Sequence, residues 1–475
     1  MEIQPLNILD SFAPADDITA SRLLAEELAD LNRKIVVLDD DPTGIQTVHG
    51  IYVYTDWSPE TLKEAFSDPS PMFFILTNSR SLSQADTTRI HREIAENVYK
   101  ASQETGKEFL LLSRGDSTLR GHYPLEPEVL KATLEGLVPY SFDAEIFCPF
   151  FPEGGRFTVN NIHYVREGDL LVPAGETEFA KDKTFSFSSS DLTAYIEEKT
   201  GGAHKKEDCI CISIEELRAM DIDGITRKLT EAEHFARIIV NAVCYTDLKV
   251  FAAAWARAMK AGHHYLARCA AALPKVIGGI SDKPLLTRQD LRPDGSRSGG
   301  LIIIGSHVKK TTQQFRELMD AHLPLEPLEF RVNTYFEDGG LEEETKRILA
   351  ETEKLISSGT TVLIYTSREL LAPEGFSEEE LLSLSVRISE ALTSIVSLLP
   401  VRPSFILAKG GITSSDVGTI GLHVKKALVL GQVKAGIPVW LTGGESTFPG
   451  MPYIIFPGNV GAPETLREIA EELIR

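Results

Sequence analysis

The chain has 475 residues, of which 43% are hydrophobic, and its formal net charge at pH 7 is −21. This length is enough for two domains with their own cores, since a domain usually takes about 100 to 200 residues. The negative charge argues against nucleic acid and anionic membranes as partners. Five cysteines without zinc-ligand spacing, an N-terminus without an apolar leader and the lack of an apolar run of about 18 residues predict a cytoplasmic protein with reduced thiols. We therefore expect small-molecule ligands.

Short apolar runs alternate with helical stretches along the whole chain. This order predicts an α/β protein of two α/β domains with largely parallel sheets and an active-site cleft between them. The predicted strands are Ile35–Leu38, Phe73–Leu76, Phe109–Leu112, Ala144–Cys148, Ile238–Val240, Leu301–Ile304, Thr361–Tyr365, Ser404–Leu407, Val439–Leu441 and Tyr453–Phe456.

The stretch between residues 281 and 300 is polar and rich in proline and glycine, which is typical of a linker. Before it, an alanine-rich segment from Asp247 to about Leu273 predicts a helix that closes the first domain. We expect a sugar-acid-binding domain at residues 1–280 and a nucleotide-binding domain at 301–475, for the reasons that follow.

The first predicted strand runs directly into Asp39-Asp40-Asp41-Pro42-Thr43-Gly44. In open α/β sheets, ligands lie just beyond the carboxyl ends of the strands. Three adjacent carboxylates repel one another unless a cation, a hydroxyl-rich ligand or hydrogen-bond donors hold them. The motif therefore predicts a site for a metal or a polyol, although the acids could also simply cap a solvated loop.

Three later strand ends of the first domain combine arginine with hydroxyl side chains. Arginine suits bidentate capture of a carboxylate, and Asp, Ser, Thr and Asn suit sugar hydroxyls. Together these segments predict a pocket for a hydroxylated carboxylic acid. The alternative places Arg80 and Arg120 on the surface at helix N-termini, where the helix dipole disfavours a cation. The segments are Thr77–Arg80, Ser113–Gly121 and Gly154–Thr158.

Glycine-rich loops follow four predicted strands of the second domain. Glycine lets backbone N–H groups approach an anion closely, as in phosphate-binding loops. We expect a nucleotide phosphate site here, with ordinary turns as the alternative. Neither a Walker motif nor a dinucleotide-binding fingerprint occurs in the sequence. The loops are Gly305-Ser306, Lys409–Asp416, Thr442–Ser446 and Pro457–Gly461.

Two other functions fit parts of this pattern. Asp39-Asp40-Asp41-Pro42-Thr43 matches the Asp-x-Asp-x-Thr motif of haloacid-dehalogenase-type phosphatases that use Mg²⁺, with Asp39 as nucleophile and Asp41 as acid/base. That mechanism needs a downstream acidic pair, yet the third strand end carries Arg114, and the second domain would have no role. A non-enzymatic sugar-acid sensor would not need the glycine loops.

Taken in order, the strand-end motifs resemble the four-carbon acid sugar kinase family, whose members phosphorylate threonate, erythronate and 3-oxo-tetronates with ATP. The resemblance covers about Ile35 to Ile474 and implies a sugar-binding N-terminal domain and a nucleotide-binding C-terminal domain. The ATP-binding positions that it implies are Ser306, Gly410, Gly411, Ile412, Thr413 and Gly458. The substrate-binding candidates are Thr43, Ser79, Arg80, Arg114, Asp116, Ser117, Arg120 and Arg156.

The sequence departs from the family pattern at Thr47 and Ile412, where members usually have acids, and at Ser306-His307-Val308, where they have Ser-Cys-Ser. In this scheme Asp40 or Asp41 is catalytic and accepts the hydroxyl proton or orients the polyol, because a carboxylate near basic groups stays ionised. Three of the arginines, Arg80, Arg114 and Arg120, hold the substrate carboxylate. We expect Mg²⁺ to accompany ATP, but the sequence assigns no ligands to it. The sequence also does not indicate which sugar acid is bound, which of its hydroxyl groups is phosphorylated, or whether the protein forms a homo-oligomer.

Overall fold

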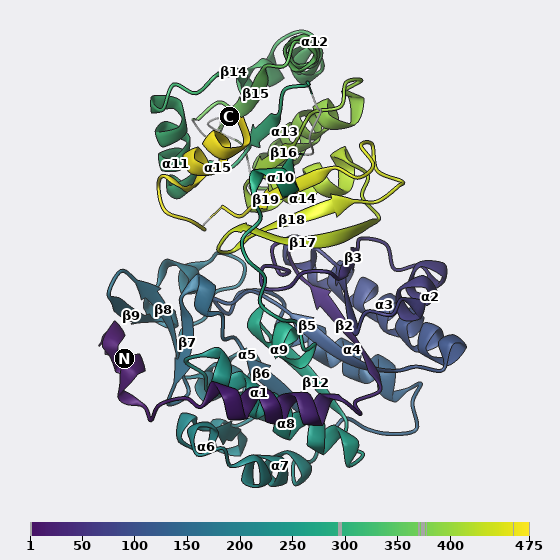
Figure 1. The fold of residues 1–475 in the computed structure, drawn as a ribbon, viewed down its shortest axis with the longest axis vertical. Coiled ribbons are helices and arrows are strands. Elements are labelled where there is room, and N and C mark those ends of the chain that lie inside the picture. Colours follow the sequence, from purple (N-terminus) through teal and green to yellow (C-terminus); the bar gives the residue numbers. More distant parts are fainter. Residues whose placement is uncertain are drawn as a thin grey trace. The chain divides into compact units, whose positions relative to one another are not determined.

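Two α/β units make up the chain, as the strand pattern predicts (Figure 1). The first unit comprises Met1–Gly44 and Asp56–Asp282, and the second comprises Ile45–Thr55 and Lys283–Arg475. This computed structural model describes residues 2–474 except 293–296, 369–370, 372–375, 377 and 459. Residues 293–296 of the predicted linker therefore lie outside the described residues.

The main sheet of the first unit is parallel, with the strand order β10-β11-β6-β12-β5-β2-β4. Helices cover both faces, so its strands are continuous apolar runs, and β4 is buried at every position. The strands are β2 (Arg33–Asp39), β4 (Met72–Leu76), β5 (Glu108–Arg114), β6 (Ala144–Cys148), β10 (Ile210–Ile212), β11 (Ala236–Val240) and β12 (Tyr265–Cys269).

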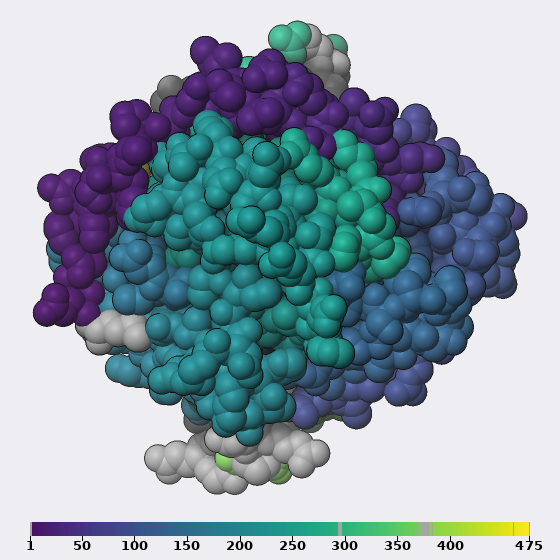
Figure 2. All heavy atoms as spheres, turned by 90° about the horizontal axis from the view of Figure 1, so that it is seen from below, coloured from purple at the N-terminus to yellow at the C-terminus, as the bar shows by residue number. Residues whose placement is uncertain are grey.

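The N-terminal helix α1 packs on the long helix α8 of the same unit. Ion pairs from Asp17 to Lys249 and from Glu27 to Arg257, both 2.7 Å long, join the two helices. Figure 2 shows this N-terminal segment in purple, lying across the teal residues that follow in the chain. The helices are α1 (Asp17–Leu28), α2 (Pro59–Ser67), α3 (Gln84–Thr105), α4 (Leu125–Glu135), α5 (Leu192–Lys199), α6 (Ile214–Arg218), α7 (Ile222–Thr230), α8 (Tyr245–Lys260) and α9 (Ala272–Ile277).

The prediction of one helix from Asp247 to Leu273 is wrong beyond Lys260. The chain turns at Gly262, which has φ of +98°, and then forms strand β12 between β5 and β6. Leucine and alanine in this strand favour a helix by their own propensity, but sheet pairing on both sides overrides that preference. This central strand carries Arg268 to the carboxyl edge of the sheet.

A second, antiparallel sheet of the first unit has the order β1-β9-β8-β7, and the apolar runs did not predict it. Its strands are short and partly exposed, so they lack a continuous apolar signal. They are β1 (Gln4–Pro5), β7 (Arg156–Val159), β8 (Ile162–Glu167) and β9 (Leu170–Pro173).

The sheet of the second unit has the order β3-β17-β18-β19-β16-β13-β15-β14. The run from β19 to β14 is parallel, whereas β18, β17 and β3 are added antiparallel. Strand β3 comes from residues 45–55, far away in the sequence. The strands are β3 (Tyr52–Tyr54), β13 (Leu301–Ile304), β14 (Leu325–Phe330), β15 (Thr361–Thr366), β16 (Ile406–Lys409), β17 (Lys426–Lys434), β18 (Ile437–Thr442) and β19 (Pro452–Phe456).

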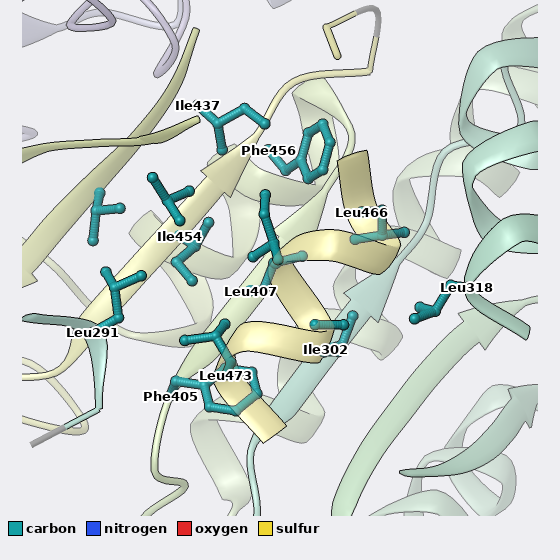
Figure 3. Packing of buried hydrophobic residues seen from close by; sticks show 14 of the residues in the cluster. Leu291, Ile302, Leu318, Phe405, Leu407, Ile437, Ile454, Phe456, Leu466 and Leu473 are labelled. Atoms are coloured by element: carbon teal, nitrogen blue, oxygen red, sulfur yellow. The ribbon is translucent and has the colours of Figure 1, made fainter. Parts of the chain in front are cut away.

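One core of the second unit lies between this sheet and the helices α11 and α15. Figure 3 shows Ile302, Leu407 and Ile454 of the sheet packed against Leu466 and Leu473 of α15. Each such side chain, when fully buried, contributes about 1.5–3 kcal/mol to stability. The helices are α10 (Arg288–Leu291), α11 (Lys309–Asp320), α12 (Gly340–Ser357), α13 (Glu378–Leu398), α14 (Gly411–Asp416) and α15 (Thr465–Ile474). Within the described parts of the chain, no helix has the length and apolarity that crossing a membrane requires.

Candidate functional site

Charged side chains from several strands meet at the carboxyl edge of the parallel sheet in the first unit. Because neighbouring strands run in one direction, the residues that follow them gather at one edge. Asp39 ends β2 and Asp40 and Asp41 follow it, Arg80 follows β4, and Arg114 ends β5. We call the acid–guanidinium cluster the group formed by Asp39, Asp40, Asp41, Arg80, Arg114, Asp116 and Arg120.

Asp39, Asp40 and Arg114 form the buried layer of this cluster. Arg114 Nη1 lies 3.0 Å from Asp39 Oδ1 and 3.3 Å from Asp40 Oδ1. The Asp39 side chain is 1% exposed, and a Cβ added at Gly44 would lie 2.1 Å from its carboxylate oxygens. Burial raises the pKa of Asp39 to about 8, although Arg114 opposes the shift, and burial also raises the pKa of Asp40. Asp39 is therefore closed off from solvent and holds its proton near neutral pH.

Asp41, Arg80 and Asp116 form the accessible layer, with side chains 17%, 19% and 12% exposed. Arg80 Nη2 contacts Asp41, and Arg80 Nη1 lies 3.3 Å from Asp116 Oδ1. The backbone N–H of Thr43 donates to Asp41 Oδ1 over 2.7 Å. Burial by itself would raise the pKa of Asp41, but Arg80, Arg114 and the hydrogen bonds from Thr43 bring that pKa below its usual value. Asp41 is thus ionised at neutral pH and open to a ligand.

Arg120 and Arg156 flank one aromatic ring beside the accessible layer. The guanidinium carbon of Arg120 lies 5.0 Å, and that of Arg156 5.8 Å, from the ring centroid of Phe179. Arg120 Nε donates to Asp116 Oδ2 over 2.8 Å. Arg156 Nε is buried and has no hydrogen-bond partner among the residues that the structure describes. These two arginines therefore retain capacity for a ligand carboxylate.

Two charged residues beneath the cluster, Arg268 and Glu126, are missing from the sequence prediction. Arg268 Nη1 contacts the Glu126 carboxylate and donates to Ser113 Oγ over 2.9 Å. The hydroxyl of Ser79 is fully buried and donates to Glu126 Oε1 over 2.5 Å. Ser79 therefore belongs to this supporting network in the structure. Arg268 gave no signal because it lies in a segment that was predicted to be helical.

The Arg268 guanidinium also explains one glycine of the Ser113–Gly121 loop. A Cβ added at Gly115 would lie 2.0 Å from Arg268 Nη2, so any larger residue there would displace the guanidinium from Glu126 and Ser113. Ser117 of the same loop is buried, and its carbonyl oxygen lies 2.8 Å from His163 Nε2. The loop is thus held from below while Asp116 faces the accessible layer.

Guanidinium groups are the cationic partners of the Asp39–Asp41 triplet in this structure. Across the described residues, no group of three or more His, Cys, Asp or Glu side chains is arranged to hold a metal ion. His263 and His264, for example, contact Asp143 and Tyr140 instead.

In the second unit, the glycine loops after β13, β16 and β19 also share one edge, since these strands are parallel. A Cβ added at Gly305 would lie 2.3 Å from Thr413 Oγ1, and one added at Gly410 would lie 2.9 Å from Ser306 Cβ. Gly410 has φ of +127°, and Gly411 begins α14. The loops therefore pack closely enough that side chains at these glycines would clash, while Ile412 remains 68% exposed.

The fourth glycine loop, Thr442–Ser446, lies at the other edge of this sheet, because β18 runs antiparallel to β19. Its Glu445 accepts hydrogen bonds of 2.8 Å from the backbone N–H groups of Lys425 and Lys426. The inclusion of this loop among the phosphate-binding loops is therefore wrong. The direction of β18 decides at which edge of the sheet the loop lies, and the local sequence does not reveal that direction.

Lys409 is fully buried at the end of β16, below these loops. Its Nζ donates to the carbonyl oxygens of Pro457, over 2.5 Å, and of Gly458, over 3.3 Å. Burial lowers the pKa of Lys409 to about 6. Lys409 thereby ties the Gly458 loop to the neighbouring strand end, whereas Asn459 lies outside the described residues.

Two family models match this chain, one in each half. A sugar-binding N-terminal domain matches residues 35–277, and a nucleotide-binding C-terminal domain matches residues 301–466. The chain is thus a two-domain protein of the class that pairs a sugar-binding with a nucleotide-binding domain. It belongs to the four-carbon acid sugar kinase family, which confirms the resemblance seen in the sequence.

Solved structures share the fold over nearly the whole chain. A protein provisionally named a tRNA synthase from Salmonella typhimurium LT2 is 15% identical, with a TM-score of 0.63, over 92% of this chain and 99% of that one. A Haemophilus influenzae protein, assigned to a family of unknown function, is 16% identical, with a TM-score of 0.56, over 93% and 100%. At these identities the likeness shows the fold alone. No curated protein matches the sequence.

Proposed function

We propose that the protein is an ATP-dependent kinase that phosphorylates a hydroxyl group of a four-carbon acid sugar of the threonate, erythronate or 3-oxo-tetronate type. A sugar-binding and a nucleotide-binding domain in one chain suggest a nucleotide-dependent sugar kinase. The observation that carries the finer proposal is the accessible layer of the acid–guanidinium cluster. It offers ionised carboxylates for hydroxyl groups beside guanidinium groups for a carboxylate, which is the chemistry of a short polyhydroxy acid.

The substrate carboxylate would bind Arg120 and Arg156. Arg120 is partly exposed, and Arg156 has an unpaired buried N–H, so a carboxylate would supply the acceptor that is missing among the described residues. Arg114 is only 4% exposed and contacts Asp39 and Asp40, so we assign it to holding the triplet in place. Arg80, between Asp41 and Asp116, would orient both carboxylates toward the sugar hydroxyls.

Asp41 would accept the hydrogen bond of the hydroxyl that is phosphorylated. Phosphoryl transfer needs in-line placement, charge neutralisation and only a modest base. An ionised, accessible carboxylate with a low pKa fits that requirement, since it orients the hydroxyl and takes its proton late. Asp40, buried next to Arg80 and Arg114, would set the position of Asp41.

The phosphates of ATP would bind at the edge formed by Ser306, Gly410, Gly411, Thr413 and Gly458, where backbone N–H groups can approach an anion. Mg²⁺ would enter with ATP, because it is usually held by substrate phosphates, waters and one or two carboxylates. It would neutralise charge on the transferred phosphoryl group. The exposed Ile412 side chain leaves the α14 end of this edge without the acid that is usual in the family.

The test is ADP release from ATP and Mg²⁺ across a panel of aldonic, tetronic and 3-oxo acids. The proposal predicts release that only four-carbon acids stimulate strongly. Phosphate release from monoesters without ATP would instead identify a phosphatase, which the burial of Asp39 beneath Gly44 argues against. Acid binding without any ATP binding would identify a sensor.

A further inference from the structure

Arg368 of the second unit forms no ion pair with the residues that the structure describes. It follows β15, at the same edge as Ser306, because β13 and β15 are parallel. Its Nη2 donates to the Ser306 carbonyl oxygen and to Thr312 Oγ1, each over 2.7 Å. Its guanidinium carbon lies 5.6 Å from the ring centroid of Phe315. The side chain is therefore fixed in position against the Ser306 loop.

The remaining nitrogens of Arg368 have no acceptor among the described residues. Nε and Nη1, which together carry three N–H groups, are buried and make no hydrogen bond within the described ranges of the chain. Burial lowers the pKa of Arg368, yet a guanidinium group still stays charged at neutral pH. Buried N–H donors without acceptors cost free energy. In the first unit, by contrast, Arg80, Arg114 and Arg268 contact carboxylates.

A second donor group lies next to Arg368. His307 Nδ1 is buried and likewise has no hydrogen-bond partner in the part of the chain that the structure describes. Burial and then the Arg368 charge lower the pKa of His307. Helix α11 begins two residues later without a side-chain cap, and its first turn contains Lys309 and Lys310 but no acid. The helix dipole makes cations unfavourable at a helix N-terminus unless an anion also binds there.

We propose that Arg368 and His307 bind a phosphate group of the nucleotide, with Arg368 as the main contact. Phosphate supplies acceptor oxygens to the free N–H groups and neutralises the unpaired charge. The inference rests on the proposed nucleotide role of the Ser306 loop and adds two side chains to a site otherwise built from backbone. Neither residue belongs to the glycine motifs of the sequence.

Titration calorimetry of the full chain with ATP, with tripolyphosphate and with adenosine tests this. Arg368→Met should lower the affinity for ATP and tripolyphosphate by about 10- to 100-fold, as expected when a charge-assisted hydrogen bond is lost. Adenosine affinity should change less than about threefold, and Arg368→Lys should recover part of the loss. His307→Leu should weaken ATP binding by about 2- to 10-fold. The matched control, Arg402→Met, removes an arginine of the same unit that donates to the carbonyl oxygens of Pro449 and Gly450, and it should leave ATP affinity within about threefold.

The ligand-free melting temperature separates binding from structure. Arg368→Met loses the two hydrogen bonds of Nη2 but also removes buried N–H groups that have no described acceptor, so the ligand-free Met variant should melt close to the wild type and yet bind ATP poorly. A ligand-free Met variant that melts lower and loses adenosine and ATP affinity equally would overturn the inference, as would unchanged ATP affinity. Wild-type protein that binds neither ATP nor tripolyphosphate would overturn it too. If Arg368 governs ATP binding but no acid stimulates ADP release, the inference stands and the proposed substrate fails.

Discussion

The carboxyl edges of the parallel strands in the two units differ in construction: charged side chains dominate the edge in the first unit, and glycine loops dominate the edge in the second. At the edge of the first unit, charged side chains contact one another, and glycine lets one side chain pack over another, as Gly115 does for Arg268. At the edge of the second unit glycines let the loops pack closely together, and the Gly410 loop packs directly on Ser306. In the first unit Arg80 and Arg114 contact carboxylates, whereas Arg368 in the second unit forms no ion pair with the described residues.

This contrast matches the two expected ligands. Small polyhydroxy acids differ from one another in the position of single hydroxyl groups, so a protein distinguishes them by directional hydrogen bonds from side chains. A phosphate chain is a common anion that backbone N–H groups can hold. Turnover should therefore be sensitive to changes of charge at the first edge. ATP affinity should be sensitive to the addition of a Cβ atom at the second edge.

The largest expected effect follows from removing charge at the first edge. Asp41→Asn keeps the volume but removes the ionised acceptor, so turnover should fall by about 10²- to 10⁴-fold. ATP affinity should change little, because the residue belongs to the first unit. Steady-state ADP release and ATP titration measure the two quantities. A fully active Asp41→Asn variant would remove the proposed role of this carboxylate.

The next effect comes from adding bulk at the second edge. A Cβ at Gly458 meets only Ser306 Oγ and Val308 Cγ2, both at 3.8 Å, so Gly458→Val should fold. Its branches would occupy space near the expected phosphate, and ATP affinity should fall by about 10- to 100-fold.

The control for this change is Gly444→Val, in the glycine loop at the opposite edge, where a Cβ meets nothing within 4 Å. ATP affinity should stay within about threefold of the wild type. Titration calorimetry measures both affinities. Equal losses of ATP affinity in Gly458→Val and Gly444→Val would contradict the placing of the phosphate site at the Gly458 edge.

The second unit should respond to pH through Lys409. Its pKa is about 6 in the fold, below the ordinary value of 10.5, so the unfolded chain binds more protons between these values. Wild-type stability should therefore rise with pH across that window, relative to Lys409→Met, by up to about 1.4 kcal/mol per pH unit. Urea unfolding of both proteins from pH 6 to 9 measures the slope. A constant difference between them would mean that Lys409 stays charged.

The first unit should respond to pH in the opposite direction through Asp39. Its pKa is raised from 3.8 to about 8, so the folded state binds more protons in that range, and wild-type stability should fall as pH rises through it. Asp39→Asn imitates the protonated form and should become more stable relative to wild type between pH 5 and 8.

Turnover of Asp39→Asn should stay within about tenfold of the wild type, the smallest effect on activity in this set. The same variant separates the kinase from the phosphatase, since the phosphatase mechanism needs Asp39 as its nucleophile. A folded variant without any turnover, beside an active Asp41→Asn, would favour the phosphatase.

Local patterns in the sequence were enough for most strands and for the motifs that follow them. The apolar runs at Ile35–Leu38 and Leu301–Ile304 lie within β2 and β13 because buried parallel strands must be apolar along their whole length. Asp41, Arg80 and Asp116 could be singled out since polar residues at strand ends are neighbours in any parallel sheet. These signals need only a few consecutive residues.

Sequence alone therefore determined the α/β class, the strand-end motifs and the family. Tertiary structure decided which acids are buried, that Arg268 on β12 supports the cluster, that Thr442–Ser446 lies at the other edge, and that residues 45–55 belong to the second unit. The physical reason is that pairing, strand direction and burial depend on partners far along the chain. Asp39, Asp40 and Asp41 are identical side chains in the sequence. Their burial, together with Arg80, Arg114 and the hydrogen bonds from Thr43, gives them different pKa values, and Asp41 is more exposed than the other two.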